Sequence, residues 1–336
     1  MGFKKLKILQ LFDLSEAALY GEDYSSFLNE SDWITEKHVF ETLTEIGHDV
    51  KLFGLYDDAT SLTHELQTNR PDLVFNMCEA FKNDRDLEPS VISLIELFGI
   101  PYTGCGPMAL YICKDKSLSK KLASFHDVNV PKFKVSQKKR PIKSLKDFVY
   151  PAIVKPLDSE GSEGIHQLSY VENESDALER IELIHTKHKS DVIIEEYIKG
   201  REIYMGVLGN EQLNVFHPWE VTFQKLPETM PKFATFKSKW DDDFRKKWGI
   251  KHLAAKGIDT ALETRISDAC KLIYKLFDMK GYGRIDLRLT DDDKFYFIEA
   301  NPNPGIAKDE DFIGAAKFSG LSYSDILSKI VALSGA

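Results

Sequence analysis

Two alternating segments near the C-terminal end constrain the fold more than any other part of the chain. Residues 283–289 (GRIDLRL) and 295–305 (FYFIEANPNPG) alternate between apolar and polar side chains, which is typical of strands that bury one face. Residues 291–294 lie between them and suit the short loop of a β-hairpin. The sequence therefore predicts an antiparallel sheet with one apolar and one polar face.

The length of the loop decides which side chains lie opposite one another in this hairpin. With four loop residues, Asp286 faces Glu299 and Arg284 faces Asn301. Successive side chains of a strand point to opposite faces of the sheet, so these four share the polar face. The core face is expected to carry Ile285, Leu287, Ile298 and Ala300.

The polar face of the hairpin suits a divalent cation. Asp286 and Glu299 repel each other when they lie opposite, which is a poor arrangement for stability alone. A cation resolves this conflict, and the oxygens of Asp286, Glu299 and Asn301 are the hard ligands that Mg²⁺ prefers. Arg284 beside them suits stabilisation of an oxyanion or of a transferring phosphoryl group. The alternative is a solvent-facing hairpin with alternating charges.

The N-terminal third alternates strands with helices. Short apolar runs typical of buried strands occur at 8–12, 50–55 and 73–75. Apolar residues at helical spacing follow the first and the third run, and Gly47 and Gly99 stand where these helices would end. This alternation predicts an α/β domain.

The rest of the chain mixes strands with longer polar connections. A strand at 152–155, a helix that Ser175 can cap and a strand at 192–197 form a small α+β unit. A helix, two strands and a final helix make up the last third. We therefore expect a chain of α/β and α+β class with three parts, which are residues 1–112, 113–196 and 197–336.

The charge of the chain argues against two classes of partner. The net charge is −9, so the chain lacks the basic field with which nucleic-acid binders and anionic-membrane binders neutralise phosphates. No run of about 18 apolar residues could span a bilayer, and no secretory signal is evident. The four cysteines are scattered without a Cys-x-x-Cys pair. These features predict a cytoplasmic protein with reduced cysteines.

Two further segments suit nucleotide recognition. Lys155 ends a buried strand and precedes a loop at 160–164 that contains Gly and Ser, so an ammonium and backbone N–H groups can surround phosphates. The next apolar strand runs into Glu195, Glu196 and later Glu202, which suits an adenine edge and ribose hydroxyls. A polar hairpin with an extended lysine is the alternative for the first segment. An ordinary exposed strand end is the alternative for the second.

In their order and spacing, these segments resemble the ATP-grasp superfamily and most closely the D-alanine–D-alanine ligase family. The resemblance begins at about residue 71 and is most specific in the last third of the chain. Besides the hairpin, its motifs are Pro101-Tyr102-Thr103-Gly104, Asp115-Lys116, Val154-Lys155-Pro156, Glu160-Gly161-Ser162, Glu195 to Glu202 and Lys239. The resemblance implies an N-terminal Rossmann-like domain followed by two α+β subdomains that clasp ATP.

The resemblance also implies which residues contact the nucleotide. The lysines that match phosphate-binding lysines of the family are Lys116, Lys155 and Lys239. The adenine-binding hinge is matched by Glu195, Glu196 and Ile198, and the ribose-binding carboxylate by Glu202.

The family's metal ligands and catalytic residues also have counterparts. Asp286, Glu299 and Asn301 match ligands of Mg²⁺, with Mn²⁺ as an alternative, in agreement with the hairpin itself. Arg284 matches the arginine that stabilises the tetrahedral intermediate. The loop around Ser162 is expected to close over the nucleotide and keep water from the intermediate.

The chemistry that the resemblance implies is the ligation of a carboxylate to an amine. A small-molecule carboxylate attacks the γ-phosphate of ATP and forms an acyl phosphate, from which an amine then displaces phosphate. Both substrates are expected to be amino acids or similar compounds. The family also often forms a homodimer through its first domain, which is an expectation for this chain too.

Four segments depart from the family's pattern. Glycines of the early glycine-rich stretch are absent from Leu11–Glu16, and the family's His-Gly is replaced by Glu79-Ala80. Trp240 stands in place of a tyrosine, and Ile306–Glu310 in place of the residues that hold the acceptor's carboxylate. Because these segments contact substrates in the family, a changed substrate is the inference.

Two other functions stay open from the sequence. The chain could be an ATP-binding sensor or scaffold without catalysis, since its substrate segments are the ones that differ. It could also be a phosphotransferase that stops after phosphoryl transfer. Arg284 argues against the first alternative, because nucleotide binding alone does not need an arginine at the reacting centre.

Overall fold

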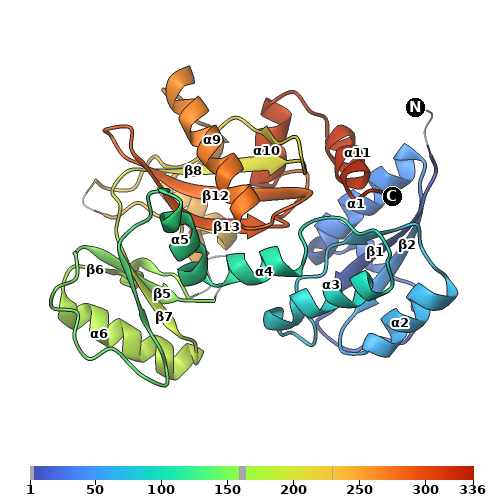
Figure 1. The fold of residues 1–336 in the computed structure, drawn as a ribbon, viewed down its shortest axis with the longest axis horizontal. Helices are drawn as coiled ribbons and strands as arrows, with labels where there is room; N and C mark the ends of the chain where they lie inside the picture. Colours follow the sequence, from blue (N-terminus) through green and yellow to red (C-terminus); the bar gives the residue numbers. More distant parts are fainter. Residues whose placement is uncertain (1–3, 159–163, 229) are drawn as a thin grey trace.

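The first sheet of the structure is parallel and follows the expected strand and helix alternation. The computed structural model describes residues 4–158, 164–228 and 230–336, and its described strands form three sheets (Figure 1). The first sheet has the order β2-β1-β3, from β1 (Lys7–Asp13), β2 (Asp49–Leu55) and β3 (Leu73–Asn76). Its helices are α1 (Ile34–Ile46), α2 (Ala59–Thr68) and α3 (Glu88–Leu97). Gly47 ends α1 with φ +110°, as predicted.

The second sheet is antiparallel and has the order β4-β7-β5-β6. Its strands are β4 (Phe133–Ser136), β5 (Ala152–Pro156), β6 (Tyr170–Val171) and β7 (Val192–Glu196). Helix α6 (Glu174–Leu183) packs on it. The prediction that Ser175 caps this helix was wrong. Asn173 is the cap, because its extended backbone lets its side chain accept the N–H of Asp176.

The third sheet is formed by strands from the C-terminal half of the chain. It has the order β11-β10-β8-β12-β13, and β9 pairs with β8. Its strands are β8 (Arg201–Leu208), β9 (Asn214–Val215), β10 (Trp219–Phe223), β11 (Ile250–Ala254), β12 (Tyr282–Leu289) and β13 (Phe295–Pro302). The surrounding helices are α4 (Pro107–Lys114), α5 (Lys116–Phe125), α7 (Phe236–Trp240), α8 (Asp242–Trp248), α9 (Thr260–Leu276), α10 (Asp311–Phe318) and α11 (Tyr323–Leu333).

Alternate residues of β8 face two different cores. Ile203, Met205 and Val207 pack with residues of α9, which covers one face of the third sheet. Leu208, on the other face, packs with residues of α10 and α11. That second core also includes residues of β1, β3 and α1, so it joins the third sheet to the first.

The predicted register of the hairpin β12–β13 is confirmed at its functional end. Arg284 pairs with Asn301 and Asp286 with Glu299. The loop has five residues rather than four, and a β-bulge between these pairs and the loop compensates, so that Leu287 pairs with Phe297.

The bulge changes the face on which two side chains of β13 lie. Phe297 is fully buried in the core, whereas Ile298 lies next to Glu299 along the wall of the pocket described below. The prediction that Ile298 belongs to the core was therefore wrong. Strict alternation fails at a bulge, because the extra residue shifts the following side chains by one position.

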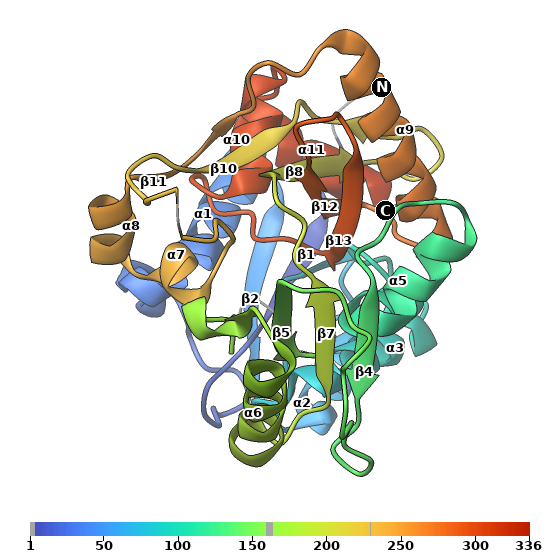
Figure 2. The ribbon, with the colours of Figure 1, turned by 90° about the vertical axis from the view of Figure 1, so that its left-hand side faces the viewer.

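The second and third sheets lie next to each other, and Figure 2 shows β5 and β7 below β12 and β13. None of the described helices is long and apolar enough to cross a membrane. All four cysteines are buried.

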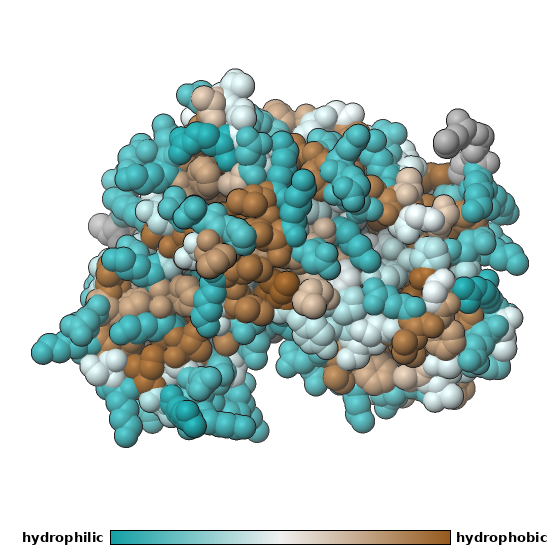
Figure 3. All heavy atoms as spheres, viewed as in Figure 1, coloured by the Kyte–Doolittle hydropathy of each residue, from teal (hydrophilic) through white to brown (hydrophobic). Residues whose placement is uncertain are grey.

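Apolar surface gathers over α4 and α5 on the face shown in Figure 3. The large apolar side chains exposed on these helices are Met108, Tyr111, Leu118 and Phe125. An exposed patch of this kind often marks a contact with another protein.

Candidate active site

A pocket lies between the second and third sheets and gathers most of the predicted site residues. Those that line it are Lys155, Glu195, Glu196, Ile198, Glu202, Lys239, Asp286 and Glu299. Arg284, Asn301 and Lys116 are not among its lining residues, although each contacts or acts electrostatically on one of them. Ser162 lies outside the described residues, as do residues 159–163 of the loop that was expected to close over the nucleotide.

Part of the pocket lining is apolar. Its apolar side chains come from strands of both sheets and from the segments between strands and before α7, and they are Ile153, Ile165, Ile198, Phe233, Leu287 and Ile298. Tyr197 adds an aromatic ring with a hydroxyl at one end. This apolar part, called the apolar slot below, suits a planar ring, and the charged residues that line the same pocket suit phosphates.

Glu195 joins two buried lysines. Its carboxylate lies 3.0 Å from the Nζ atoms of both Lys155 on β5 and Lys120 on α5. Lys120 is fully buried and also donates to the carbonyl of Ile298. The side chain of Glu195, predicted for the adenine hinge, thus holds two lysines, of which Lys155 lines the pocket.

Lys120 is a residue that the sequence analysis missed. It lies four residues after Lys116 in α5, so the two share one face of that helix. This spacing is the signal that could have found it. Burial lowers the pKa of Lys120 to about 8, and the nearby carboxylate of Glu195 limits the decrease.

Charges around Glu299 favour its ionised form. Burial alone would raise its pKa, but the ammonium groups of Lys116, Lys155 and Lys239 lower it to about 2. Burial also works against the charge of Lys155, yet Glu195 and Glu299 raise the pKa of that lysine. The pocket therefore holds an anion amid several cations, and such a cluster can bind a polyphosphate together with a divalent cation.

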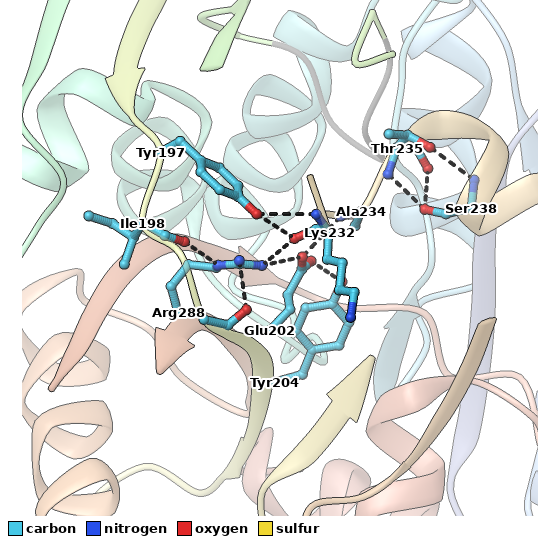
Figure 4. Close-up of polar contacts among 10 residues, drawn as sticks. Tyr197, Ile198, Glu202, Tyr204, Lys232, Ala234, Thr235, Ser238 and Arg288 are labelled. Atoms are coloured by element: carbon cyan, nitrogen blue, oxygen red, sulfur yellow. Dashed lines mark hydrogen bonds and ion pairs between the residues drawn. The ribbon is translucent and has the colours of Figure 1, made fainter. Parts of the chain in front are cut away.

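Lys239 and Lys116 are both held by capped helices. Lys239 belongs to α7, where Thr235 and Ser238 exchange hydrogen bonds in a capping box (Figure 4). Lys116 is the first residue of α5, and Asp115 caps that helix by accepting the N–H of Ser117 at 2.8 Å. Both lysines are thus attached to the ends of short, fixed elements.

Arg284 and Asp286 form a bidentate ion pair on the polar face of β12. Nε and Nη2 of Arg284 lie 2.8 and 2.9 Å from the two carboxylate oxygens. The amide of Asn301 donates to Asp286 at 3.1 Å, and the Arg284 guanidinium lies 4.4 Å from the centre of the Tyr204 ring. Burial raises the pKa of Asp286, opposed by Arg284 and supported by Glu299.

The predicted metal ligands fit a hard divalent cation by their chemistry. Asp286, Glu299 and Asn301 occupy neighbouring paired positions of β12 and β13, and they offer two carboxylates and an amide oxygen. Among the described residues, no three His, Cys, Asp or Glu side chains form a metal-binding group. An amide and the phosphates of a nucleotide would therefore have to complete the coordination, which is usual for Mg²⁺.

Glu202 lines the pocket and is already hydrogen-bonded on both oxygens. Oε1 accepts the hydroxyl of Tyr204 at 2.9 Å, and Oε2 accepts the N–H of Ala234 at 2.9 Å (Figure 4). Arg288 forms an ion pair with Oε2 at 3.3 Å. The carboxylate predicted for ribose is therefore fixed in direction by three protein groups.

Arg288 is a second residue that the sequence analysis missed. It is buried, lines the pocket and donates to three backbone carbonyls as well as to Glu202 (Figure 4). The signal was present in the alternation of β12, because Arg288 follows Arg284 and Asp286 at intervals of two residues.

The region that departs from the family pattern carries its own polar cluster. In α10, Asp311 accepts the indole N–H of Trp219 at 3.1 Å and lies 2.6 Å from Nδ1 of His252. Burial would raise the pKa of Asp311, but His252 and Arg284 lower it. Burial raises the pKa of the neighbouring Glu310, and Asp311 raises it further. This side of the site is acidic.

Two other departing segments meet at the ends of parallel strands. The carboxylate of Asp13, at the end of β1, accepts the N–H of Glu79 at 2.7 Å, just after β3. The carboxyl ends of parallel strands are where α/β folds commonly bind ligands.

Trp240, the fourth departing position, is largely exposed at the end of α7.

Several proteins that are similar to this chain in sequence and fold are named as ligases. The family model for the D-ala D-ala ligase C-terminus matches residues 116–332. A D-alanine–D-alanine ligase of Caldicellulosiruptor bescii is 32% identical over 273 residues, which are 78% of this chain and 70% of the relative. An uncharacterised protein of Sinorhizobium fredii, y4sG, is 29% identical over 87% of this chain and 85% of the relative.

The fold has counterparts among solved structures. A D-alanine–D-alanine ligase of Bacillus anthracis, solved as a complex with ATP, superposes with a TM-score of 0.74 at 20% identity. The superposition covers 98% of this chain and 97% of that one. VanG, a D-Ala:D-Ser ligase of Enterococcus faecalis, gives a TM-score of 0.70 at 22% identity over 98% of this chain and 100% of that one.

The fold and the matched sequence together define an ATP-dependent carboxylate–amine ligase of the ATP-grasp class. The chain belongs to the D-alanine–D-alanine ligase family, since the family model covers well over half of it. The resemblance inferred from the sequence, and the fold class with it, are confirmed.

Proposed function

We propose that this chain uses ATP and Mg²⁺ to activate a small carboxylate as an acyl phosphate and then joins it to an amine. The observation that carries the proposal is the pocket between two sheets, where lysines from β5 and α7 surround the carboxylates of β12 and β13. A nucleotide with its phosphates toward these lysines would place the γ-phosphate near Arg284.

In this proposal the apolar slot takes adenine. The backbone of Glu196 and Ile198 supplies its hydrogen bonds, and Glu202 meets the ribose hydroxyls. Lys155 and Lys239 contact phosphates, and Lys116 adds its charge from the start of α5. Glu195 acts mainly by holding Lys155 and Lys120 in place.

Asp286, Glu299 and Asn301 would hold Mg²⁺, or Mn²⁺ in its place. The bound ion would neutralise charge on the phosphate oxygens during phosphoryl transfer. Lysines around Glu299 keep that carboxylate ionised, so it is ready to act as a ligand. The loop that contains Ser162 remains our candidate for a cover over the phosphates.

The reaction has two steps. An oxygen of the carboxylate substrate bonds to the γ-phosphorus, and ADP leaves with the electrons of the broken P–O bond. The amine nitrogen then bonds to the acyl carbon, inorganic phosphate leaves, and the nitrogen loses its proton. We assign to Arg284 the stabilisation of the oxyanion in this second step; the support is that Asp286 and the ring of Tyr204 hold its guanidinium.

We propose that both substrates are amino acids or related small molecules, with a choice that differs from D-alanine pairs. The support is the acidic cluster of Glu310 and Asp311, which would repel the carboxylate of an amino-acid acceptor. D-alanine is still the first compound to test, because curated relatives are named for it.

We also propose three parts for the chain, each built around one of the three sheets, with boundaries near residues 112 and 196. The first boundary falls within α4.

A homodimer is proposed as well, supported by the exposed apolar side chains of Met108 and Tyr111 on α4. Light scattering of the purified protein measures the mass that this predicts.

The experiment that tests the function is phosphate release from ATP and Mg²⁺ across a matrix of amino acids, offered singly and in pairs. Release that requires one particular pair, with ADP and a condensed product in the mass spectrum, supports ligation and identifies both substrates. A phosphorylated product without incorporation of the amine would instead support a phosphotransferase. ATP binding without turnover across a broad matrix would favour a nucleotide sensor.

A further inference from the structure

We propose that Arg288 is a positioning residue for adenine recognition, because it fastens two separate walls of the base pocket to each other. The first wall is the hinge segment, residues 197–200, and the second is the cover segment, residues 232–234. The proposal rests on the proposed function only in that the pocket binds an adenine nucleotide.

The guanidinium of Arg288 contacts both walls at once (Figure 4). Nε donates to the carbonyl of Ile198 at 3.0 Å, and Nη2 donates to the carbonyl of Gly200 at 2.8 Å. Nη1 donates to the carbonyl of Lys232 at 3.0 Å. A planar group with fixed donor directions thus sets the position of the hinge relative to the cover.

Two further contacts strengthen the same connection. The hydroxyl of Tyr197 accepts the N–H of Lys232 at 3.1 Å, and the Arg288 guanidinium lies 5.5 Å from the centre of the Tyr197 ring. The N–H of Ala234 donates to Glu202, which also pairs with Arg288. The cover segment is therefore tied to the hinge through Arg288, Tyr197 and Glu202.

Gly200 lets the hinge approach β12 closely enough for these bonds. Its φ of +157° suits glycine, and a Cβ at this position would lie 2.2 Å from the carbonyl oxygen of Leu289. The hinge backbone therefore lies directly against the strand that carries Arg288. Any other residue would push the carbonyl of Gly200 away from the guanidinium.

This arrangement predicts that Arg288 affects binding of the base and not binding of the phosphates. Ile198 and Phe233, one on each wall, are lining residues of the apolar slot, and Arg288 determines the gap between the two walls. Arg288 forms its described hydrogen bonds and ion pair with the two walls and with Glu202, whereas the lysines that we propose to contact the phosphates stand on β5 and α7. Loss of Arg288 should thus weaken binding of the base and leave binding of the phosphates nearly unchanged.

The test compares a nucleotide with a phosphate chain that has no base. The Arg288→Met variant, the Arg288→Lys variant and the wild type are titrated by calorimetry with ADP and, separately, with tripolyphosphate, each with Mg²⁺. For Arg288→Met we expect ADP to bind at least about tenfold more weakly, as for the loss of several oriented hydrogen bonds. Tripolyphosphate should bind within about twofold of wild type. Arg288→Lys should lie between, because an ammonium cannot reach three carbonyls in one plane.

Arg201 supplies a matched control. It lies on the adjacent strand β8, pairs with Glu220 at 2.6 Å and donates to the carbonyl of Lys256. Its register partner in β12 is Leu289, so its side chain lies on the opposite face of the sheet from Arg288. Arg201→Met should bind both ligands as the wild type does.

Three results would overturn the proposal. The first is ADP binding by Arg288→Met at wild-type strength. The second is equal weakening for ADP and tripolyphosphate, which would make Arg288 a general support of the fold. If Arg288→Met does not fold, the third is Arg288→Lys, with wild-type circular dichroism, binding ADP as tightly as wild type. A wild type that binds tripolyphosphate but not ADP would instead refute the nucleotide site of the proposed function.

Discussion

The glutamate between two buried lysines gives a quantitative prediction about stability. Glu195 is 3% exposed, and it lies 3.0 Å from the ammonium groups of both Lys120 and Lys155. The Glu195→Gln substitution keeps the volume of the side chain but removes its negative charge, so two buried lysines remain side by side without their anion. Breaking a buried ion pair by neutralising one partner costs about 3 to 5 kcal/mol of unfolding free energy. We expect a loss in that range at neutral pH.

The pH dependence of this loss follows from the two lysines. The raised pKa of Lys155 contributes stability that is complete below the unfolded value of 10.5 and is lost as pH rises through the folded pKa. The pKa of Lys120 is lowered to about 8, so the unfolded chain binds more protons between about pH 8 and 10.5. Glu195 raises the pKa of both lysines, so in its absence each pKa should be lower than in the wild type. The difference between variant and wild type should therefore shrink as pH rises from 7 toward 10.

Urea unfolding, followed by tryptophan fluorescence and circular dichroism at several pH values, measures this difference. Glu65→Gln is the matched control, since Glu65 is also buried, yet its lysine, Lys51, is 53% exposed. Water solvates the remaining charge there, so we expect a cost of about 1 kcal/mol. A loss below about 1 kcal/mol for Glu195→Gln at neutral pH, or an equal loss at pH 7 and pH 10, would refute the reasoning.

Three further predictions concern the reaction. Glu299→Gln should reduce turnover at least about a thousandfold, because it removes a metal ligand, and should also lower the melting temperature, because the lysines that lower the pKa of Glu299 lose their anion; phosphate release and scanning calorimetry measure the two effects. Arg284→Met should lower kcat about 100- to 1,000-fold and leave ADP affinity within a few fold, as for loss of an oxyanion-stabilising donor; equal losses in both quantities would contradict that role. Removal of divalent cations with EDTA should stop phosphate release, and either Mg²⁺ or Mn²⁺ should restore it, which a coupled assay follows directly.

Local patterns were enough to predict β12, β13 and the polar face of their hairpin, whereas the neighbouring strands β8, β10 and β11 of the same sheet were not predicted. The alternation around Asp286 and Glu299 has a physical cause in the pleat of a strand, so their pairing could be worked out from the sequence. Two errors cancelled in that derivation, because the loop has one residue more than expected and the bulge at Ile298 takes it up. Bulges depend on tertiary packing and have no reliable sequence signal.

Residues that act through distant partners could not be predicted in the same way. Lys120 on α5, a helix that packs against β13, meets Glu195 on β7, and Arg288 meets the carbonyl of Lys232 across a gap of 56 positions in sequence. Such contacts depend on how separate elements pack, which a local pattern does not encode. The prediction of the helix cap failed for a local reason, because Asn173 and Ser175 are both good capping residues and lie two positions apart.

The bulge at Ile298 separates the hairpin tip from the chemistry of the site. Strand β12 pairs with β8 along its whole length, so its position does not depend on the tip, and the pairs beyond the bulge fix Glu299 and Asn301. An insertion of residues between Thr290 and Lys294 would change only the outer three pairs of the hairpin. The tip is thus a place where this chain can accept an added segment, such as a label or a small peptide, without moving the carboxylate and amide on which we propose that the metal depends.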